Sequence, residues 1–383
     1  MSCYKGWSHY NPVKILFQEN SLGKLSFLIK SKRGLIITSP GSTKRGLTDR
    51  IKSLLGDFEI EVLDQVEPNP DIRKIEAYRQ NYQDRNFQFI VGVGGGSVMD
   101  TAKALAYLLN VKDHNFSLQA FFTDKVLLPQ VAPLEMIAVP TTAGTGSEVT
   151  PFATIWDMEI QKKYSLHKHD LFFNQALLDP ELTIDLPLEI TIATGLDALS
   201  HALESIWNKN ANYISLSYAF TAVEMVLRNL PLLANGINKI GYRSQMLSAS
   251  LLGGLAISST RTALAHSISY PITAAVGMPH GLACSFTLPT LLDYNNQADD
   301  GRIEMLLNKL GFGSSLAMKE ALLDLFKEIN LKELLKGYGL NRELLIAMIP
   351  QMFTPERAEN NLRNVKKDDM QSILAEAYDL IYY

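Results

Sequence analysis

The chain has 383 residues, of which 46% are hydrophobic and 20% charged, a composition typical of a globular protein with enough length for two cores. Its 40 acidic and 36 basic residues give a net charge of −4, and the scattered Lys and Arg residues offer no basic surface for nucleic acid. No run approaches the ~18 apolar residues of a membrane span, and the opening MSCYKGWSHYNP lacks a signal-peptide core. Two cysteines without a pairing pattern, Cys3 and Cys284, suit a reducing compartment, so we expect a cytoplasmic protein.

The first half of the chain alternates strand-like and helix-like segments. This alternation predicts an α/β domain over residues 1–182, with a mostly parallel sheet covered by helices on both faces. The expected strands are 34–38, 59–63, 89–93 and 136–139, and the expected helices are 44–55, 72–84 and the segment that follows the third strand.

After LLDPELTIDLP, near residue 180, helical patterns dominate and no convincing β-branched strand separates them. We therefore expect an all-α domain over residues 183–383. The expected helices are 191–207, 211–229, 243–269, 280–293, 314–328, 342–350 and 367–382.

A glycine-rich turn stands in FQFIVGVGGGSVMDTAKALAYLL, residues 87–109. An apolar strand meets Gly94, Gly95 and Gly96, and Ser97 then opens a helix. Glycines let a phosphate approach the backbone, and the N–H groups of a helix N-terminus face the anion. The match to G-x-G-x-x-G is imperfect because Ser97 occupies the third position, so the motif alone is weak evidence for a dinucleotide.

A second loop of small residues lies in MIAVPTTAGTGSEVTPFATIWD, residues 136–157. It can hold the ribose and phosphate of a nicotinamide cofactor, although an ordinary Thr/Gly-rich turn is an equal alternative. The hydroxyls that would make these contacts are those of Thr141, Thr142, Thr145 and Ser147.

Four residues of the second half form a candidate metal set. Asp197 and His201 in GLDALSHALE are four positions apart and share one helical face, and His266 and His280 can complete a cage of three nitrogens and one oxygen. A single histidine is more often a core or surface residue, but the chain has only seven, and the other four sit in polar or loop-like sequence. Such a donor set accepts Fe(II), Zn(II) or other first-row ions.

The blocks VGGGSVMDTAKA, PTTAGTGSEVT, GLDALSHALE and PHGLACSFTLP resemble, in order and separation, the signature blocks of the iron-dependent (group III) alcohol dehydrogenases. The resemblance runs from about residue 10 to beyond residue 290. It implies a dehydroquinate synthase-like fold, a nicotinamide cofactor on the glycine loop, and a metal held by Asp197, His201, His266 and His280. Iron is favoured, with zinc as a substitute, and a homodimer is the family expectation.

Assigned in this way, the cofactor belongs to the first domain and the metal to the second, which predicts an active site in the cleft between them. There the metal would polarise an aldehyde carbonyl, and the nicotinamide would deliver hydride. The residue four positions after the third ligand is often a second histidine in the family, but here it is Tyr270. We expect Tyr270 to orient substrate or relay a proton, with packing before Pro271 as the alternative.

The choice of nicotinamide cofactor should be set after the strand GLIIT. The family places an acidic residue there to hold the adenosine ribose, whereas this chain continues through Ser39 and Ser42 without an acid. Lys44 or Arg45 can pair with a 2′-phosphate, which favours NADPH, with NADH tolerated.

Two further residues are cofactor candidates with structural alternatives. Asp100 lies on the first turn of the glycine helix, where it can contact cofactor or stabilise the turn through the helix dipole. Lys163 resembles the family lysine that reaches the cofactor ribose, or it is a solvated surface lysine.

The substrate-binding positions implied by the resemblance are Phe152, Thr154, Thr262 and Tyr270. Phe152 replaces an asparagine common in the family, which implies a differently shaped pocket. Arg261, beside Thr262, suggests an anionic substrate, although an ion pair within a helix is the alternative.

The runs PFATIWD, KKYSLH, ALESIWNKNAN and STRTALAHSISYP resemble the phosphonoacetaldehyde reductase branch of this family. That branch reduces phosphonoacetaldehyde to 2-hydroxyethylphosphonate, and Lys209 and Asn210 can join Arg261 in binding the phosphonate. Reduction of another short-chain aldehyde is the first alternative. A glycerol-1-phosphate dehydrogenase, a dehydroquinate synthase and a metal-free scaffold are weaker ones.

Overall fold

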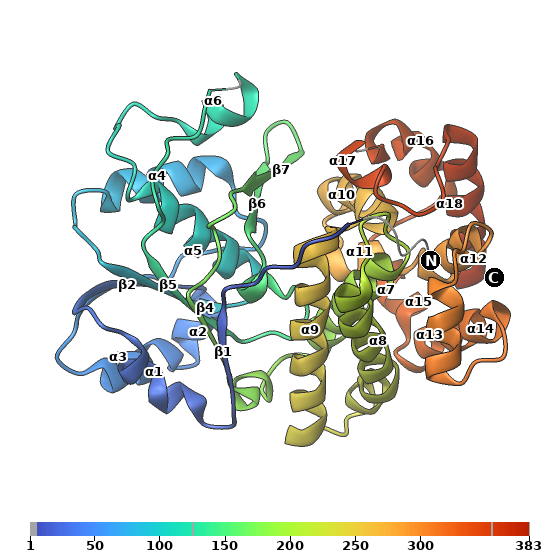
Figure 1. Cartoon of the computed structure of the whole chain (residues 1–383), viewed down its shortest axis with the longest axis horizontal. Coiled ribbons are helices and arrows are strands. Elements are labelled where there is room, and N and C mark those ends of the chain that lie inside the picture. The colour runs from blue at the N-terminus through green and yellow to red at the C-terminus, as the bar shows by residue number, and fades with distance from the viewer. Residues whose placement is uncertain (1–5, 125, 354, 383) are drawn as a thin grey trace. The chain divides into compact units, whose positions relative to one another are not determined.

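The computed structural model describes residues 6–124, 126–353 and 355–382 and divides into two compact units (Figure 1). The sheet unit contains residues 11–142 and 147–183. The helical unit contains the described residues up to Tyr10, the short segment Ala143–Gly146 and the chain from Ile184 onward. The predicted combination of an α/β domain and a helical domain is confirmed.

The sheet unit is built on six strands that all pair in parallel, in the order β1-β8-β5-β4-β2-β3. The central strand β4 is buried along its whole length, as expected for a parallel strand covered on both faces. The six strands are β1 (Lys14–Phe17), β2 (Arg33–Thr38), β3 (Glu59–Leu63), β4 (Phe89–Gly94), β5 (Glu135–Pro140) and β8 (Gln175–Leu178).

Helices cover both faces of this sheet. On one face, Phe89 and Val91 of β4 pack with Leu25 and Ile51 in an apolar core, and on the other face Gly92 lies against Ala102. The helices of the unit are α1 (Leu25–Leu28), α2 (Pro40–Lys44), α3 (Leu47–Leu55), α4 (Ile72–Tyr82), α5 (Gly96–Leu108) and α6 (Leu118–Thr123), with 3₁₀ turns at Ser21–Lys24, Ser147–Val149 and Pro180–Thr183.

The strands predicted from sequence are present as β2, β3, β4 and β5, but four others escaped prediction. β1 and β8 have only four residues each, too few for a clear alternating pattern. The other two, β6 (Phe152–Asp157) and β7 (Lys162–His167), form a separate antiparallel hairpin. The predicted helix 44–55 is also divided, because Gly46 adopts a left-handed conformation between α2 and α3.

In the helical unit, α7, α8 and α9 pack against one another, and α11 packs on α7 (Figure 1). None of the helices within the described ranges combines the length and the hydrophobicity that a membrane span requires. The helices are α7 (Leu188–Ile206), α8 (Tyr213–Ala234), α9 (Ile240–Thr260), α10 (Leu264–Val276), α11 (His280–Ser285), α12 (Leu288–Asn296), α13 (Arg302–Leu310), α14 (Ser315–Glu328), α15 (Leu331–Lys336), α16 (Arg342–Met352), α17 (Pro355–Ala358) and α18 (Lys367–Tyr382).

The predicted continuous helix 243–269 is wrong. It is two helices, α9 and α10, because Arg261 has φ +63° and ends the first of them. The predicted helix 280–293 is likewise two helices, α11 and α12. The break at Arg261 has a chemical consequence, because it turns the first backbone N–H groups of α10 toward a buried carboxylate of α7.

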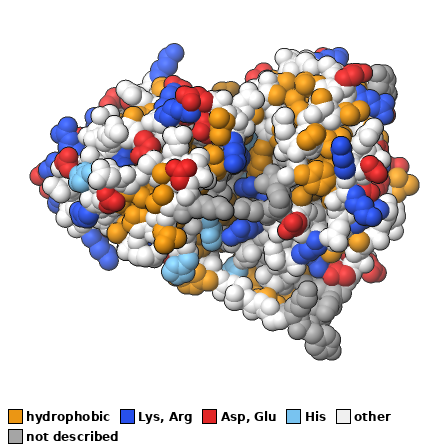
Figure 2. All heavy atoms as spheres, turned by 90° about the horizontal axis from the view of Figure 1, so that it is seen from above, with side chains coloured by type: hydrophobic (Ala, Val, Ile, Leu, Met, Phe, Trp, Pro, Cys, Tyr) orange, Lys and Arg blue, Asp and Glu red, His pale blue; other side chains and the backbone are white. Residues whose placement is uncertain are grey.

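Charged side chains of both signs are interspersed over the face shown in Figure 2. This distribution agrees with the small net charge of −4. It gives the visible face no extended basic region of the kind that attracts a nucleic acid backbone.

Candidate metal and cofactor sites

The four predicted metal-binding residues come from three helices of the helical unit. Asp197 and His201 lie one turn apart on α7, His266 lies on α10, and His280 begins α11. Gly281 explains how α11 comes so close to α7. A Cβ at this position would stand 1.8 Å from the carbonyl oxygen of Ala193, so only glycine fits the contact.

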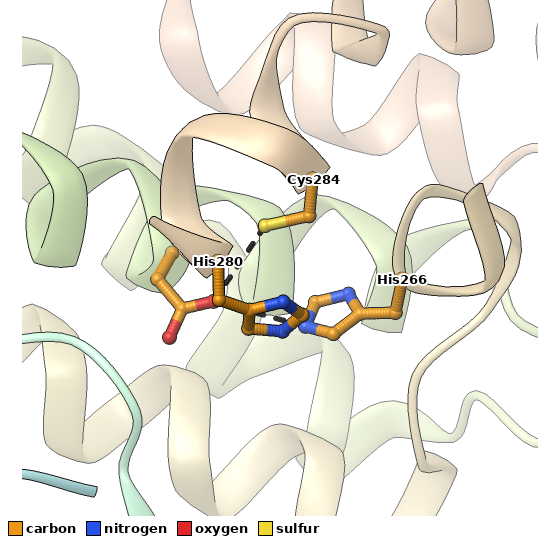
Figure 3. Close-up of side chains that lie close together, drawn as sticks. His266, His280 and Cys284 are labelled. Atoms are coloured by element: carbon orange, nitrogen blue, oxygen red, sulfur yellow. Dashed lines mark hydrogen bonds and ion pairs between the residues drawn. The ribbon is translucent and has the colours of Figure 1, made fainter. Parts of the chain in front are cut away.

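These side chains converge. The Nε2 atoms of His201 and His266 each lie 3.7 Å from Asp197 Oδ1. The His266 ring stacks on that of His201 with centroids 4.8 Å apart and meets the ring of His280 edge-on at 5.0 Å. Figure 3 shows the side chains of His266 and His280 directed toward each other. Asp197, His201 and His266 are buried, whereas His280 is half-buried.

The other ring nitrogen of each histidine is held by an acceptor. His201 Nδ1 lies 3.3 Å from the carbonyl oxygen of Gly144, and His266 Nδ1 lies 2.5 Å from Glu204 Oε2. His280 Nδ1 lies 3.3 Å from the Ser269 hydroxyl oxygen, whose own proton is donated to the backbone oxygen of His266. Each Nδ1 therefore carries a hydrogen, which leaves the lone pair on Nε2 as the metal-binding atom.

Glu204 is a functional candidate that the sequence analysis missed. Its fully buried carboxylate accepts hydrogen bonds from the backbone N–H groups of Ala263, Ala265 and His266 and from the His266 ring. Burial raises the pKa of Glu204 to about 7, although these donors favour its charged form. Its position three residues after His201, on the same face of α7, was the available signal.

Cys284 also belongs to this cluster, although it was not among the predicted metal-binding residues. Its buried Sγ lies 3.6 Å from Asp197 Oδ1 (Figure 3). Asp197, His266, His280 and Cys284 each offer one ligand atom, and all four atoms lie within 4.8 Å of one another. Burial and the neighbouring Asp197 carboxylate raise the pKa of the Cys284 thiol well above its usual value.

The donor set fits a divalent transition metal. Three imidazoles with their Nε2 lone pairs directed inward and one carboxylate form a borderline-soft set of the kind that binds Fe(II) or Zn(II). The Glu204 contact to His266 is the usual outer support of a metal-binding imidazole, since it fixes both tautomer and ring orientation.

The glycine loop lies at the carboxyl end of β4. The strand order 3-2-4-5 reverses direction between β2 and β4, which makes the ends of these two strands a topological switch point, the usual ligand site of an open α/β sheet. Gly94 ends β4, Gly95 precedes α5, and Gly96 begins it. A Cβ on Gly95 would meet the Thr142 side chain at 3.1 Å, so the predicted Gly and Thr loops touch.

Ser39 and Ser42 lie at the carboxyl end of β2, on the other side of the same switch point. Their hydroxyl oxygens are 3.3 Å apart, and Lys44 and Arg45 beyond them are exposed. The Ser97 hydroxyl accepts a hydrogen bond from the backbone N–H of Asn69. Beside this contact lies a pocket of about 310 Å³. Its lining includes Asn69, Asp71, Lys74 and Thr101, none of which the sequence analysis selected.

Asp100 and Ser147, both predicted to bind cofactor, are bonded to each other. The Ser147 hydroxyl donates to Asp100 Oδ1 at 2.7 Å, and the other Asp100 oxygen accepts from the backbone of Thr154 at 3.0 Å. Fully buried Lys103, which the sequence analysis did not select, donates to Ser147 at 2.9 Å and to Thr150 at 3.0 Å. These contacts tie the glycine helix to the start of the hairpin.

The remaining cofactor candidates have different surroundings. The backbone N–H of Thr141 donates to Gly94 O at 2.9 Å, which aligns the two loops. Thr145 lies in the short segment Ala143–Gly146 that belongs to the helical unit. Lys163 is half-buried on β7, with its ammonium 5.4 Å from the ring centre of Trp156.

The substrate candidates divide between the two units. Phe152 and Thr154 lie on β6 of the sheet unit, and Thr262 and Tyr270 lie in the helical unit. Tyr270 is buried and stacks on the metal-site residue His280, with ring centres 5.7 Å apart. Burial raises the pKa of Tyr270 to about 12, although Arg357 and the Thr262 side chain lower it.

The positive charges near Tyr270 differ from those expected. Arg261 is exposed, and Lys209 is bonded to Glu359 O and to the Asn364 side chain. Arg357, which the sequence analysis did not select, lies with its guanidinium carbon 4.7 Å from the Tyr270 ring centre. Tyr270 thus contacts both the Arg357 guanidinium and the ring of His280. The positive charge of Arg357 is therefore separated from the candidate metal centre by one aromatic ring.

Comparison with protein-family models is decisive. Residues 12–180 match the model described as iron-containing alcohol dehydrogenase, and residues 191–378 match the C-terminal model of the same family. The chain belongs to the iron-containing alcohol dehydrogenase family. It is therefore an oxidoreductase of the alcohol dehydrogenase and aldehyde reductase type, as the sequence blocks had indicated.

Several members of the iron-containing alcohol dehydrogenase family align over most of the chain. A sulfoacetaldehyde reductase of Bilophila wadsworthia is 29% identical over 96% of this chain and 97% of its own length. The crystal structure of sulfoacetaldehyde reductase from Bifidobacterium kashiwanohense in complex with NAD+ matches with a TM-score of 0.89 and 30% identity, covering 97% of this chain and 99% of that one. Aldehyde-alcohol dehydrogenase 2 of Entamoeba histolytica is 34% identical over 75% of this chain, which spans only 34% of that protein.

Proposed function

We propose that this protein reduces a small aldehyde bearing an anionic group to the primary alcohol, with phosphonoacetaldehyde to 2-hydroxyethylphosphonate as the leading reaction. The observation that carries the proposal is the convergence of His201 and His266 on Asp197, with His280 beside them and each Nδ1 hydrogen held by an acceptor. Such a centre supports carbonyl chemistry, and the family supports hydride transfer with a nicotinamide cofactor.

Asp197, His201, His266 and His280 would hold Fe(II), for which Zn(II) is a substitute. A cation bound there supplies Lewis-acid stabilisation of the negative charge that develops on the carbonyl oxygen. The protein residues keep the donors in place, since Glu204 fixes the His266 ring and the Gly144 carbonyl fixes that of His201. Half-buried His280 marks the accessible side of the cluster.

Tyr270 would orient the substrate and hand a proton to the product oxygen. With its pKa raised to about 12, the phenol stays protonated at neutral pH and acts as a hydrogen-bond donor rather than as a base. Its stacking on His280 and its contact with the Arg357 guanidinium fix the position of the ring.

The cofactor would bind at the switch point of the sheet unit. Gly94, Gly95, Gly96 and Ser97 would meet its phosphates, and Thr141 and Thr142 would lie beside them. We assign Asp100 and Ser147 to shaping this loop through their mutual hydrogen bond. NADPH is favoured over NADH because exposed Lys44 and Arg45 follow Ser39 and Ser42 without an intervening acid.

The anionic end of the substrate would be bound near Tyr270. The position of Arg357 over the Tyr270 ring supports Arg357 as the residue that binds this anionic end. Arg261 was proposed for the same role only because it is next to Thr262 in the sequence. A guanidinium can bind a phosphonate or sulfonate with two parallel hydrogen bonds. Phe152 and Thr154 remain candidates for shaping the pocket.

Sulfoacetaldehyde is the second candidate substrate, because two relatives over nearly the whole chain are named sulfoacetaldehyde reductases. It differs from phosphonoacetaldehyde mainly in carrying one negative charge rather than up to two. A neutral short-chain aldehyde is the third candidate. A dehydroquinate synthase or glycerol-1-phosphate dehydrogenase type of reaction is less favoured by the block GLDALSHALE.

The test is NADPH and NADH oxidation by the Fe(II)-loaded protein with phosphonoacetaldehyde, sulfoacetaldehyde and propionaldehyde. We expect the highest kcat/KM with phosphonoacetaldehyde and NADPH. Arg357→Met should raise KM for the anionic aldehydes by about 10- to 100-fold, the worth of a charged hydrogen bond, and leave propionaldehyde unaffected. Arg261→Met is the matched variant that decides between the two arginines.

Equal kcat/KM for propionaldehyde and the anionic aldehydes would overturn the anionic specificity. A lower KM for NADH than for NADPH would overturn the cofactor preference. No aldehyde-dependent oxidation with either cofactor would overturn the reductase proposal itself. We further propose a cytoplasmic homodimer, which light scattering coupled to size-exclusion chromatography tests for the oligomer.

A further inference from the structure

The thiol of Cys284 lies within the donor cluster of the metal centre. Its Sγ is 3.6 Å from Asp197 Oδ1 and 3.4 Å from the Ser200 hydroxyl oxygen, and the residue has no exposed surface. Together with one ligand atom each from Asp197, His266 and His280, it completes a four-donor group whose atoms all lie within 4.8 Å.

The local structure explains this placement. Cys284 and His280 are four residues apart on α11, so they lie on the same helical face one turn from each other. Close packing of α11 on α7, which Gly281 allows, holds this face against Asp197. The thiol is thus presented by the same backbone contact that presents His280.

The separation between Sγ and the carboxylate matches that of two ligands on one ion. Metal–sulfur bonds of about 2.3 Å and metal–oxygen bonds of about 2.1 Å at a tetrahedral angle place the two ligand atoms about 3.6 Å apart. The observed distance is 3.6 Å. The four ligand atoms of the group lie within 4.8 Å of one another, so the remaining side chains would move closer together on binding a common ion.

The geometry points to Cys284 as a fifth donor that gives the centre two alternative ligand sets. Asp197, His266 and His280 belong to both sets. A thiophilic ion such as Zn(II), Co(II) or Cd(II) takes the Cys284 thiolate as its fourth ligand, whereas the harder Fe(II) takes His201. Binding through Cys284 forms one metal–sulfur bond, breaks the S–H bond and releases one proton to solvent.

His201 is well placed to be the ligand that changes. Its Nε2 is 3.7 Å from Asp197 Oδ1, and its ring stacks on that of His266. When sulfur fills the fourth position, His201 keeps its hydrogen bond to the Gly144 carbonyl and its stacking contact. The residues that bind the ion would thus differ between Fe(II) and a thiophilic ion.

Cobalt spectroscopy tests this proposal directly. The chain has only one other cysteine, so a Cys3→Ser variant leaves Cys284 as its single thiol. Co(II)-loaded Cys3→Ser protein should show the near-ultraviolet charge-transfer band of a cobalt–thiolate bond. Adding Cys284→Ser should abolish the band, and adding His201→Ala should preserve it. Absence of the band from the Cys3→Ser protein, or its persistence after Cys284→Ser, would overturn the proposal.

Affinity measurements separate a ligand from a hydrogen-bond donor. If Cys284 is a ligand, Cys284→Ser lowers Zn(II) affinity by about tenfold or more and leaves Fe(II) affinity nearly unchanged. If the thiol only donates a hydrogen bond to Asp197, the serine hydroxyl replaces it and neither affinity changes, which contradicts the proposal. Circular dichroism of the metal-free variants checks their folding.

The inference uses the metal centre of the proposed function but not its substrate. Cobalt spectra and metal affinities are read without aldehyde or cofactor. A protein that binds Co(II) through Cys284 but reduces no aldehyde would leave this inference standing and remove the proposed reaction. An active reductase without a thiolate band would do the reverse.

Discussion

In each unit a fully buried charged side chain next to a candidate site organises its surroundings, and these two side chains, Glu204 and Lys103, differ in what they organise. In the helical unit, Glu204 accepts from three backbone N–H groups and from the His266 ring. In the sheet unit, Lys103 donates to Ser147, Thr150 and Phe152 O. Glu204 thus positions a side chain that can bind metal, whereas Lys103 positions a backbone loop.

The comparison shows two ways of building a site. The candidate cofactor site depends on backbone N–H groups at the ends of parallel strands, so its supporting residues need only hold loops in place. The candidate metal centre depends on side chains of three helices, so its support must fix individual rings and tautomers. The two kinds of support should fail in different ways.

Removing the buried carboxylate of Glu204 should have the largest effect on the stability of the protein. Glu204→Ala leaves several buried donors without an acceptor, at about 1–3 kcal/mol each, so we expect the free energy of unfolding to fall by about 4 kcal/mol or more. Urea denaturation followed by circular dichroism measures this loss. Glu189→Ala, an exposed position on the same helix, is the control and should change little. A loss for Glu204→Ala no larger than that of the control would show that the carboxylate is not the organiser we infer.

The counterpart in the sheet unit is Lys103→Met. It keeps the length of the side chain but removes three hydrogen bonds and the charge beside Asp100 and Glu148, which should cost about 3 kcal/mol. Lys103→Met should also weaken NADPH binding, which fluorescence titration measures, and should leave the affinity for Co(II) unchanged. Exposed Lys112→Met is the control. If Lys103→Met weakens Co(II) binding as strongly as NADPH binding, the division of labour between the two units is wrong.

A smaller effect should appear as pH dependence in the sheet unit. Glu148 is buried, its Oε1 has no hydrogen-bond partner among the described residues, and burial raises the pKa of its carboxyl from 4.5 to about 7. The folded state therefore holds this proton more tightly than the unfolded state. The resulting stability is fully present below pH 4.5 and is lost as pH rises through about 7.

The test of this pH dependence is Glu148→Gln, whose side chain stays neutral at every pH. Its stability advantage over the natural chain should grow between pH 4.5 and about 7 and level off above that pH. Denaturant unfolding at several pH values measures the difference. A constant difference across this range would mean that Glu148 ionises in the folded protein as it does in the unfolded chain, which would contradict the raised pKa.

The smallest expected effect is that of Tyr270→Phe. The loss of one hydrogen-bonding hydroxyl near the metal centre should lower kcat/KM by roughly tenfold, equivalent to about 1.4 kcal/mol, and leave Co(II) affinity unchanged. Tyr242→Phe on α9 is the control. Unchanged kcat and KM in Tyr270→Phe would reduce this tyrosine to a packing residue and remove its proposed role in proton transfer.

The sequence alone determined the elements whose signals are local. β2 to β5 and α5 follow from apolar runs, glycine turns and helical periodicity, because these patterns depend on residues a few positions apart. The motif blocks likewise identified the family, and they selected Asp197, His201, His266 and His280, which the fold brings together.

Only the tertiary structure decided which groups support and extend the metal centre. Glu204 and His266 are 62 residues apart, and Asp197 and Cys284 are 87 apart, so no local pattern reports their contact. The helix break at Arg261 could not be predicted from local sequence either. It occurs where the first N–H groups of α10 donate to an acceptor on another helix, Glu204 of α7. Periodicity records which face of an element is buried, whereas hydrogen bonds between elements depend on how those faces meet.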